Sequence, residues 1–298
     1  MSGKPGERGG AVMNVDPPRA AVVDAVTRAL AEDLLPLGDL TAALIPSGTA
    51  VEATIAARQP GVVAGRACVV ETFAQLDPEV KIGWLLPDGS AFEAGDVVAT
   101  VAGPLAAIVT GERTALNFLR HLSGVASLTR RFVDAAAEAS GGRTRVLDTR
   151  KTTPGLRALE KAAVRAGGGS NHRANLSDAV MVKDNHLAGM GIPAAVEAAR
   201  RAWPGRPVHV ECDTLEQFDV VLAAGADRVM VDNFTPGQVA EAMRRVSAGA
   251  SRIEVEVTGG VDLEHVRAYA AAAPDYISVG AITHSAGVVD LGLDLGHP

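Results

Sequence analysis

The chain has only two cysteines, Cys68 and Cys212, in 298 residues. They are far apart and form no CxxC pair, which excludes a disulfide framework and a cysteine-based zinc site. No apolar run approaches the ~18 residues of a membrane span, because the longest, residues 97–109, is interrupted by a Gly-Pro pair. The opening residues, MSGKPGERGG, lack the apolar segment of an export signal. We therefore expect a cytoplasmic protein that contacts no membrane.

Length and composition predict a globular protein of more than one domain. At ~150 residues per domain, the length suggests about two domains. Hydrophobic residues make up 47% of the chain and charged residues 21%, which excludes a disordered or collagen-like chain. Residues 1–13 are Gly-rich and polar, so we expect them to form a mobile tail.

The charge is unevenly distributed along the sequence. The whole chain has a formal charge of −7, which disfavours a nucleic-acid-binding protein. Between Arg143 and Arg173, however, eight Lys and Arg residues face only two carboxylates, Asp148 and Glu160. A basic pocket in an acidic protein suits a small polyanion better than a polymer.

The first half of the chain predicts an α+β sandwich. A helix is indicated where Val22, Val23, Val26 and Leu30 fall on one face. Between residues 51 and 109, turn signals separate a helix near residues 68–76 from short strands in VEATIAA, GVVAG, DVVATV and AAIV. A long helix is then predicted over residues 112–138, with a break or bend near Gly124.

The second half alternates between strands and helices, which is typical of parallel βαβ units. The expected strands are residues 145–148, 179–183, 208–211, 228–232, 253–257 and 276–279. The expected helices are residues 156–166, 193–203, 215–224, 236–246 and 263–272. A polar or glycine-containing segment follows each strand, and in a barrel all these segments meet at one mouth. A doubly wound sheet would place its ligand at a single switch point, so the pattern favours a barrel.

Two glycine-containing loops predict a phosphate site. Thr258-Gly259-Gly260 follows one strand and precedes a predicted helix, and Gly280 follows the next strand. Backbone N–H groups of such loops, together with a helix N-terminus, bind phosphate in many barrels, and His284 could add a donor. The alternative is that these glycines only form tight turns.

A set of cationic side chains is expected at the same mouth. Its members are Arg150, Lys151, His172, Arg173 and Lys183, with Arg113 further upstream. Planar arginines suit carboxylates, whereas lysines act as point charges for phosphates. A solvated surface is the alternative, and it fits Lys183 poorly because residues 180–182 read as the interior of a strand.

Two carboxylates, Glu211 and Asp232, each end a predicted buried strand. An unpaired carboxylate among apolar neighbours is costly, so these groups need cations, hydroxyls or Mg²⁺ as partners. General acid–base work and a salt bridge to Lys183 or Lys151 are the competing roles.

Several segments together resemble the quinolinate phosphoribosyltransferase family. They are GERTALNFLRHLSGVASLTRRFVDA, VLDTRKTTPGLRALEKAAVRAGGGSNHR, VMVKDNH, VECDT, VMVDNF and DYISVGAITHSA. The similarity runs from about Glu32 to Leu295, and Thr258 stands where the family more often has Ser. The resemblance implies transfer of phosphoribosyl from phosphoribosyl pyrophosphate (PRPP) to quinolinate, with decarboxylation, in the synthesis of NAD.

The resemblance also implies the architecture. It predicts an N-terminal α/β sandwich at residues 14–116, joined by residues 286–298, and an incomplete, seven-stranded α/β barrel of TIM type at residues 117–285. Only six strands follow from the pattern, so the seventh is implied by the family alone. A homodimer is implied as well, in which Arg113 reaches into the partner's site.

The family assigns roles to this chain's matching residues. Quinolinate would be bound by Arg113, Thr149, Arg150, His172, Arg173 and Lys183. PRPP would be bound by Lys151, Glu211, Asp232, Thr258, Gly259, Gly260, Gly280 and His284. Lys151, Glu211 and Asp232 would be catalytic, and the two carboxylates would share Mg²⁺ with PRPP.

Three other functions stay open at this point. A related transferase could act on nicotinate, or on the unknown substrate of a molybdenum-operon paralogue. A non-catalytic barrel could bind a sugar phosphate without turnover. An aldolase-type barrel could use Lys183 as a Schiff-base amine.

Overall fold

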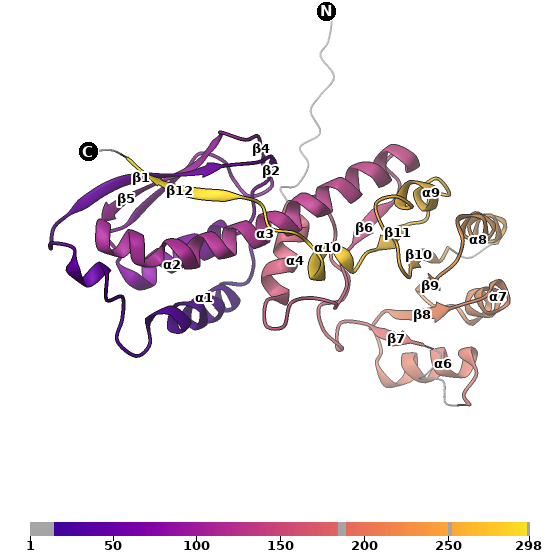
Figure 1. Ribbon diagram of the computed structural model, residues 1–298. Coiled ribbons are helices and arrows are strands. Elements are labelled where there is room, and N and C mark those ends of the chain that lie inside the picture. The colour runs from indigo at the N-terminus through magenta and orange to yellow at the C-terminus, as the bar shows by residue number, and fades with distance from the viewer. Residues whose placement is uncertain (1–14, 184–188, 250–251, 297–298) are drawn as a thin grey trace, which may run out of the picture.

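The computed structural model describes residues 15–183, 189–249 and 252–296. Figure 1 shows two parts, a small antiparallel sheet with its helices and a larger α/β part, joined by one long helix. The predicted tail, residues 1–13, lies outside the described residues. Within the described ranges, no helix is both long and apolar enough to cross a membrane.

The N-terminal part is built on a four-stranded antiparallel sheet in the order β12-β1-β5-β3. Its strands are β1 (Ala50–Ala57), β3 (Lys81–Trp84), β5 (Val97–Pro104) and β12 (Leu291–Leu295). Two helices, α1 (Arg19–Leu34) and α2 (Arg66–Leu76), belong to this part. It also contains a 3-10 turn at Ala42–Leu44 and a two-stranded ribbon of β2 (Gly61–Val62) and β4 (Ala91–Phe92). Strand β12 follows the larger part in the chain and returns to pair with β1, so residues 291–295 complete the sheet of the N-terminal part (Figure 1).

Helix α3 (Leu105–Ser140) is one uninterrupted helix that runs through both parts (Figure 1). Two sequence predictions are therefore wrong. The AAIV segment at residues 106–109 is helical. Pro104 directly precedes the helix with a φ of −59°, which suits a helix start, and the two alanines of the segment have high helix propensity. Gly124 does not break the helix; instead it lets α3 approach the chain at Gly287 closely.

The larger part is a six-stranded parallel sheet in the order β6-β11-β10-β9-β8-β7. Its strands are β6 (Arg145–Leu147), β7 (Val180–Val182), β8 (Val208–Cys212), β9 (Arg228–Asp232), β10 (Glu254–Thr258) and β11 (Tyr276–Ser278). The order follows the chain from β7 to β11, and the first strand then pairs with the last. This is the sequence of strands in an α/β barrel and not in a doubly wound sheet, so every strand ends at the same mouth.

Helices cover the outer side of this sheet (Figure 1). They are α4 (Arg157–Ala166), α6 (Ile192–Ala202), α7 (Leu215–Ala224), α8 (Pro236–Ala248), α9 (Val266–Ala270) and α10 (Ala281–His284). Along β9, Val229 and Val231 are buried in the apolar core, whereas Met230 and Asp232 line a cleft on the other face. Successive side chains of a strand point to opposite faces of the sheet, so every second residue of β9 faces the cleft.

Two details of the predicted barrel differ from the structure. Among the described residues, the parallel sheet has six strands, and β6 and β7 do not pair with each other. In place of a seventh strand there is an isolated bridge between Leu147 and Ser170. The helix expected at residues 263–272 is shorter and begins at Val266. Its first turn therefore begins three residues further from Gly260 than predicted.

The close approach of α3 to residue 287 gives a first prediction. A Cβ on Gly124 would lie 1.9 Å from the carbonyl oxygen of Gly287, so Gly124→Ala should lower the free energy of unfolding by about 3 kcal/mol. Gly237→Ala is the matched control, because Gly237 also lies in a helix and no atom is within 4 Å of the position that its Cβ would take. It should stabilise the protein by up to about 1 kcal/mol. Urea unfolding of both variants tests this, and equal effects would contradict it.

Buried His209 on β8 gives a prediction for the pH dependence of stability. Burial, together with the charges of Arg228 and His172, lowers the pKa of His209 to about 4. In the unfolded chain the pKa of a histidine is about 6.5, so between these values only the unfolded state takes up this proton. Acidification from pH 6.5 to pH 4 should therefore cost about 3 kcal/mol through this group. Urea unfolding across this pH range should show a smaller loss in His209→Gln than in wild type.

Candidate active site

A cleft of about 310 Å³ opens at the carboxyl ends of the parallel strands. Ten of the residues predicted from the sequence line it: Thr149, Arg150, Lys151, His172, Arg173, Lys183, Glu211, Asp232, Thr258 and Gly259. They come from five strands and from the loops that follow them. The barrel topology thus brings together residues that are up to 110 positions apart in the sequence.

The remaining predicted residues lie at different distances from this cleft. Gly280 is beside Lys151, because a Cβ on Gly280 would lie 3.0 Å from Cδ of Lys151 and 3.2 Å from Nε2 of His284. Gly260 follows Gly259 but is not among the lining residues. Arg113 lies on α3, does not line the cleft, and its side chain is 62% exposed.

Three cations of the cleft have no ion-pair partner among the described residues. Within the described part of the chain, Arg150, Lys151 and Arg173 form no ion pair with a carboxylate. The Arg173 guanidinium donates instead to the carbonyl of Ala179 at 3.0 Å. Burial and the neighbouring charge of Arg150 lower the pKa of Arg173. Three such cations in one confined space repel one another, which favours the binding of an anionic ligand.

The fourth cation of the cleft has a partner. The Lys183 ammonium donates to Glu211 Oε2 at 2.5 Å, which confirms the salt bridge considered for these strand ends. Asp232, on the neighbouring strand, forms no ion pair with any described residue. Among the described residues, no three His, Cys, Asp or Glu side chains cluster to hold a metal ion.

The loop that carries His172 and Arg173 is fixed from beneath by Asp148. This carboxylate is fully buried at the end of β6 and accepts from the backbone N–H of His172 at 2.8 Å. It also accepts from Asn171 Nδ2 at 2.7 Å and from Lys161 Nζ at 2.5 Å. Burial raises the pKa of Asp148, and the Lys161 charge opposes that rise. The Asp148–Lys161 pair thus joins a strand, a helix and the ligand-facing loop.

The turns after β9 and β10 have backbone conformations that their sequences permit. Asn233 has φ of 55°, and its N–H donates to the carbonyl of Thr258 at 3.1 Å. Asparagine tolerates this left-handed conformation better than most side chains. Gly259 has φ of 88°, and a Cβ there would lie 2.5 Å from Oδ1 of Asp232. Glycine is therefore needed where the loop passes Asp232, apart from any role in phosphate binding.

Four cleft residues were not predicted from the sequence: Met181, Met230, Glu256 and Ser278. Each precedes a predicted site residue or loop glycine by two positions, as Met230 precedes Asp232 and Glu256 precedes Thr258. Side chains two apart on a strand point to the same face, so this spacing could have found them.

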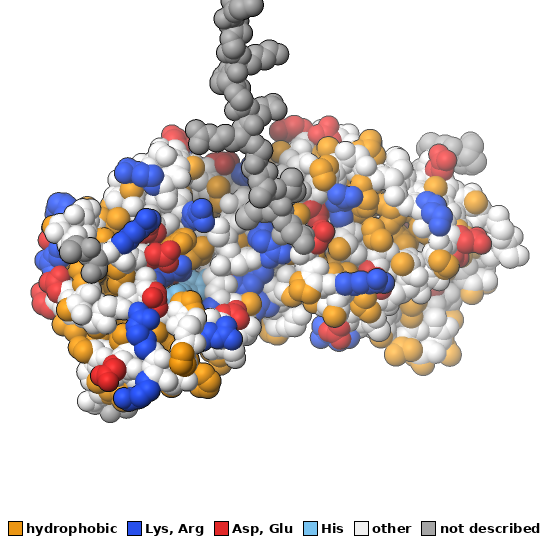
Figure 2. All heavy atoms as spheres, turned by 180° about the vertical axis from the view of Figure 1, so that it is seen from behind, with side chains coloured by type: hydrophobic (Ala, Val, Ile, Leu, Met, Phe, Trp, Pro, Cys, Tyr) orange, Lys and Arg blue, Asp and Glu red, His pale blue; other side chains and the backbone are white. Residues whose placement is uncertain are grey.

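Elsewhere on the molecule, charges of both signs lie close together. Figure 2 shows Asp and Glu side chains interspersed with Lys and Arg over much of one face. Surface arginines pair with carboxylates, for example Arg245 with Asp219 at 2.7 Å and Arg120 with Asp290 at 3.0 Å.

Comparison with known proteins agrees with these observations. The family model for the C-terminal domain of quinolinate phosphoribosyl transferase matches residues 125–294, and that for its N-terminal domain matches residues 39–123. A nicotinate-nucleotide pyrophosphorylase [carboxylating] of Mycobacterium leprae is 41% identical over 92% of this chain and 97% of its own. The human enzyme of the same name is 39% identical over 85% of each chain. The structure of the nicotinate-nucleotide pyrophosphorylase from Francisella tularensis matches with a TM-score of 0.88 at 37% identity, over 94% of this chain and 98% of that one. The chain belongs to the quinolinate phosphoribosyltransferase family.

Proposed function

We propose that this protein transfers the phosphoribosyl group of PRPP to quinolinate, giving nicotinate mononucleotide, pyrophosphate and CO₂. One observation carries the proposal: three unpaired cations and two strand-end carboxylates line a single cleft. Quinolinate and PRPP are both anions, and a cationic site lets them approach each other. The names of the relatives, carboxylating nicotinate-nucleotide pyrophosphorylases, support the same reaction.

The arginine-rich side of the cleft is assigned to quinolinate. Arg150 and Arg173 offer planar guanidinium groups that match the two carboxylates of a pyridine dicarboxylate. Thr149, His172 and Lys183 complete this side. A monocarboxylate such as nicotinate would leave more of these charges unbalanced, so the charge count favours quinolinate.

The opposite side is assigned to PRPP. Lys151 would bind the pyrophosphate, and Glu211 and Asp232 would contact the ribose hydroxyls. Thr258, Gly259, Gly260, Gly280 and His284 would hold the 5′-phosphate through backbone N–H groups and side-chain donors. The contact of Gly280 with Lys151 and His284 supports a continuous phosphate-binding edge.

Mg²⁺ fits this site as a metal that arrives with PRPP. Proteins often bind Mg²⁺ through one or two carboxylates together with substrate phosphates, and Glu211 and Asp232 are the carboxylates available here. The metal would neutralise charge on the departing pyrophosphate.

In this reaction the side chains stabilise developing charge and orient the substrates, and none of them has to serve as an activated nucleophile. The lone pair of the pyridine nitrogen forms the bond to C1′ of the ribose as the bond from C1′ to pyrophosphate breaks. Lys151 stabilises the negative charge that develops on pyrophosphate, and the carboxylates stabilise the positive charge that develops on the ribose. The alkylated ring nitrogen then accepts the electron pair released when the 2-carboxylate leaves as CO₂, and a proton from solvent replaces it. Fixed orientation and exclusion of water are the contributions that this second step requires.

A Schiff-base role for Lys183 is less consistent with the structure. An amine attacks a carbonyl through a free lone pair, whereas Lys183 Nζ is held in a salt bridge to Glu211 Oε2 at 2.5 Å. The pairing instead orients Lys183 for an anionic substrate.

A homodimer is the proposed assembly, with Arg113 reaching into the partner's cleft. Arg113 is mostly exposed and outside the cleft of its own chain. Four leucines between residues 35 and 44 are exposed as well: Leu35 by 73%, Leu37 by 77%, Leu40 by 66% and Leu44 by 82%. An apolar patch of this kind marks a protein–protein interface more often than a free surface. A cytoplasmic location is proposed with it, since both cysteines are free and buried.

The direct test of the function is a reaction of purified protein with quinolinate, PRPP and Mg²⁺. Nicotinate mononucleotide and CO₂ should appear in equal amounts. Turnover of nicotinate in place of quinolinate would refute the dicarboxylate assignment, and ligand binding without turnover would indicate a regulator.

Two substitutions test separately the roles proposed for the two sides of the cleft. Arg150→Ala should raise the KM for quinolinate about tenfold to a hundredfold, because a charged hydrogen bond contributes roughly 1.5–3 kcal/mol. Lys151→Ala should affect chiefly the kinetics with PRPP. Steady-state measurements with each substrate varied in turn test both variants. An unchanged KM for quinolinate in Arg150→Ala, or an effect of Lys151→Ala on quinolinate alone, would refute the division.

Subunit complementation tests the position of Arg113. Arg113→Ala and Arg150→Ala should each be weakly active alone. Co-expressed in equal amounts, they should recover about a quarter of wild-type activity, because half of the dimers are mixed and one of their two sites is intact. If Arg113 serves its own chain, no mixed dimer has an intact site and no activity returns.

A further inference from the structure

Glu256 is a carboxylate to which nothing above assigns a role. It lies on β10 two residues before Thr258, lines the cleft, and is fully buried. A negative charge at this position would repel two anionic substrates unless other groups neutralise and orient it. Its neighbours therefore decide what it can do.

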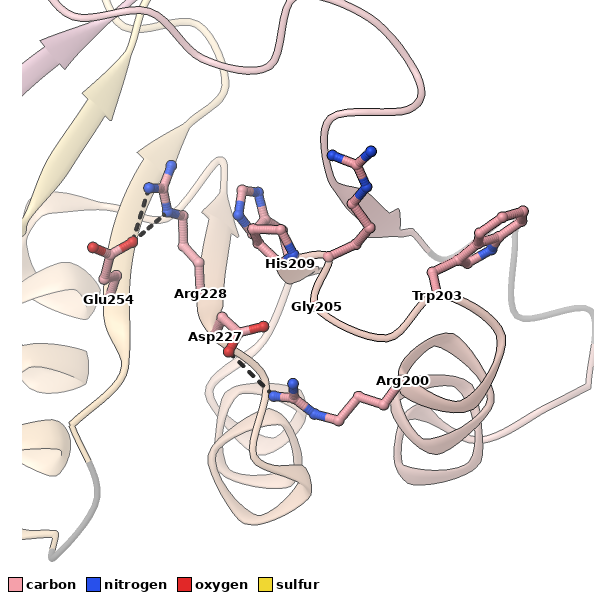
Figure 3. Close-up of a pocket in the computed structure, with 9 residues that line it drawn as sticks. Arg200, Trp203, Gly205, His209, Asp227, Arg228 and Glu254 are labelled. Atoms are coloured by element: carbon pink, nitrogen blue, oxygen red, sulfur yellow. Dashed lines mark hydrogen bonds and ion pairs between the residues drawn. The ribbon is translucent and has the colours of Figure 1, made fainter.

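Arg228 holds Glu256 from the amino-terminal side of the sheet. Its Nη1 donates to Glu256 Oε2 at 2.8 Å, and its Nε and Nη2 donate to Glu254 Oε2 at 3.0 and 2.8 Å. The guanidinium also lies 4.0 Å over the ring of Tyr276. Figure 3 shows Arg228 and Glu254 at a pocket lined by residues from the strand starts, such as Gly205 and Asp227. Glu256 thus has a rigid, charged support that lies away from the substrate cleft.

His172 contacts Glu256 from the cleft side. Its Nε2 lies 3.2 Å from Glu256 Oε2, and its Nδ1 accepts from the backbone N–H of Arg173 at 2.7 Å. Because Nδ1 is the acceptor of this bond, the N–H of the ring is on Nε2 and faces Glu256. Among the described residues, no group meets hydrogen-bond geometry with this buried Nε2, and the Glu256 carboxylate lies within ion-pair distance of it. Burial would raise the pKa of Glu256, but His172 and Arg228 hold it below its ordinary value.

We propose that Glu256 is a positioning residue for quinolinate, which acts by holding the ring of His172. The ring held in this way fixes the main chain at Arg173, whose guanidinium lines the cleft. The inference rests on the proposed function, because it takes quinolinate as the ligand of Arg173. An arginine displaced by about 1 Å can lose most of its contribution to binding and orientation, so a residue that never touches substrate can govern affinity.

The experiment is a double-mutant cycle with KM values as the readout. Glu256→Leu should raise the KM for quinolinate about tenfold and leave the KM for PRPP within twofold, because only the quinolinate side depends on His172. Combined with His172→Ala, it should add no further increase, since the two residues act in series. Glu256→Gln keeps an acceptor oxygen and should raise the KM for quinolinate less. If Glu256→Leu fails to fold, Glu256→Gln takes its place in the cycle.

Glu254→Gln is the matched control, because it alters the other carboxylate of Arg228 without contacting His172. It should leave the KM for quinolinate within twofold. Equal increases in both KM values, or additive effects of Glu256 and His172 substitutions, would overturn the inference. Absence of quinolinate turnover by the wild-type enzyme would instead refute the proposed function, so the two failures are distinguishable.

Discussion

The structure depends on positive charge at one end of a parallel sheet, held there without an ion-pair partner among the described residues. Arg150, Lys151 and Arg173 line one cleft and none of them pairs with a carboxylate of the described residues. Such a cluster repels itself, and the fold must restrain it through the backbone. Asp148 supplies much of that restraint, because it binds the loop of His172 from beneath while Lys161 balances its charge.

The site residues at strand ends could be predicted, because the sequence shows both their polar side chains and the ends of the strands that position them. A polar residue directly after a buried apolar run, as at Lys183 and Asp232, must lie at the mouth of a parallel sheet. Residues inside a strand were missed, because Glu256 and Met230 resemble ordinary strand residues until the facing side of the strand is known. Their contacts with Arg228 and His172 depend on strand neighbours that are far away in sequence.

Other features could not follow from local pattern. The AAIV segment has the composition of a short strand, yet it continues the helical repeat of the residues after it. Gly124 resembles a helix breaker, whereas in the structure it leaves room for the main chain at residue 287. No local sequence pattern reveals this contact. Arg113 has no partner in the cleft of its own chain, so a single sequence can place it only by resemblance.

Strand β12 has a consequence for synthesis of the protein. It pairs with β1, although some 230 residues and the whole parallel sheet separate the two strands in the chain. While the protein emerges from the ribosome, the outer edge of β1 must therefore wait, unpaired, until residues 291–295 are released. An open edge of this kind recruits other chains, so nascent molecules are exposed to aggregation until β12 has emerged.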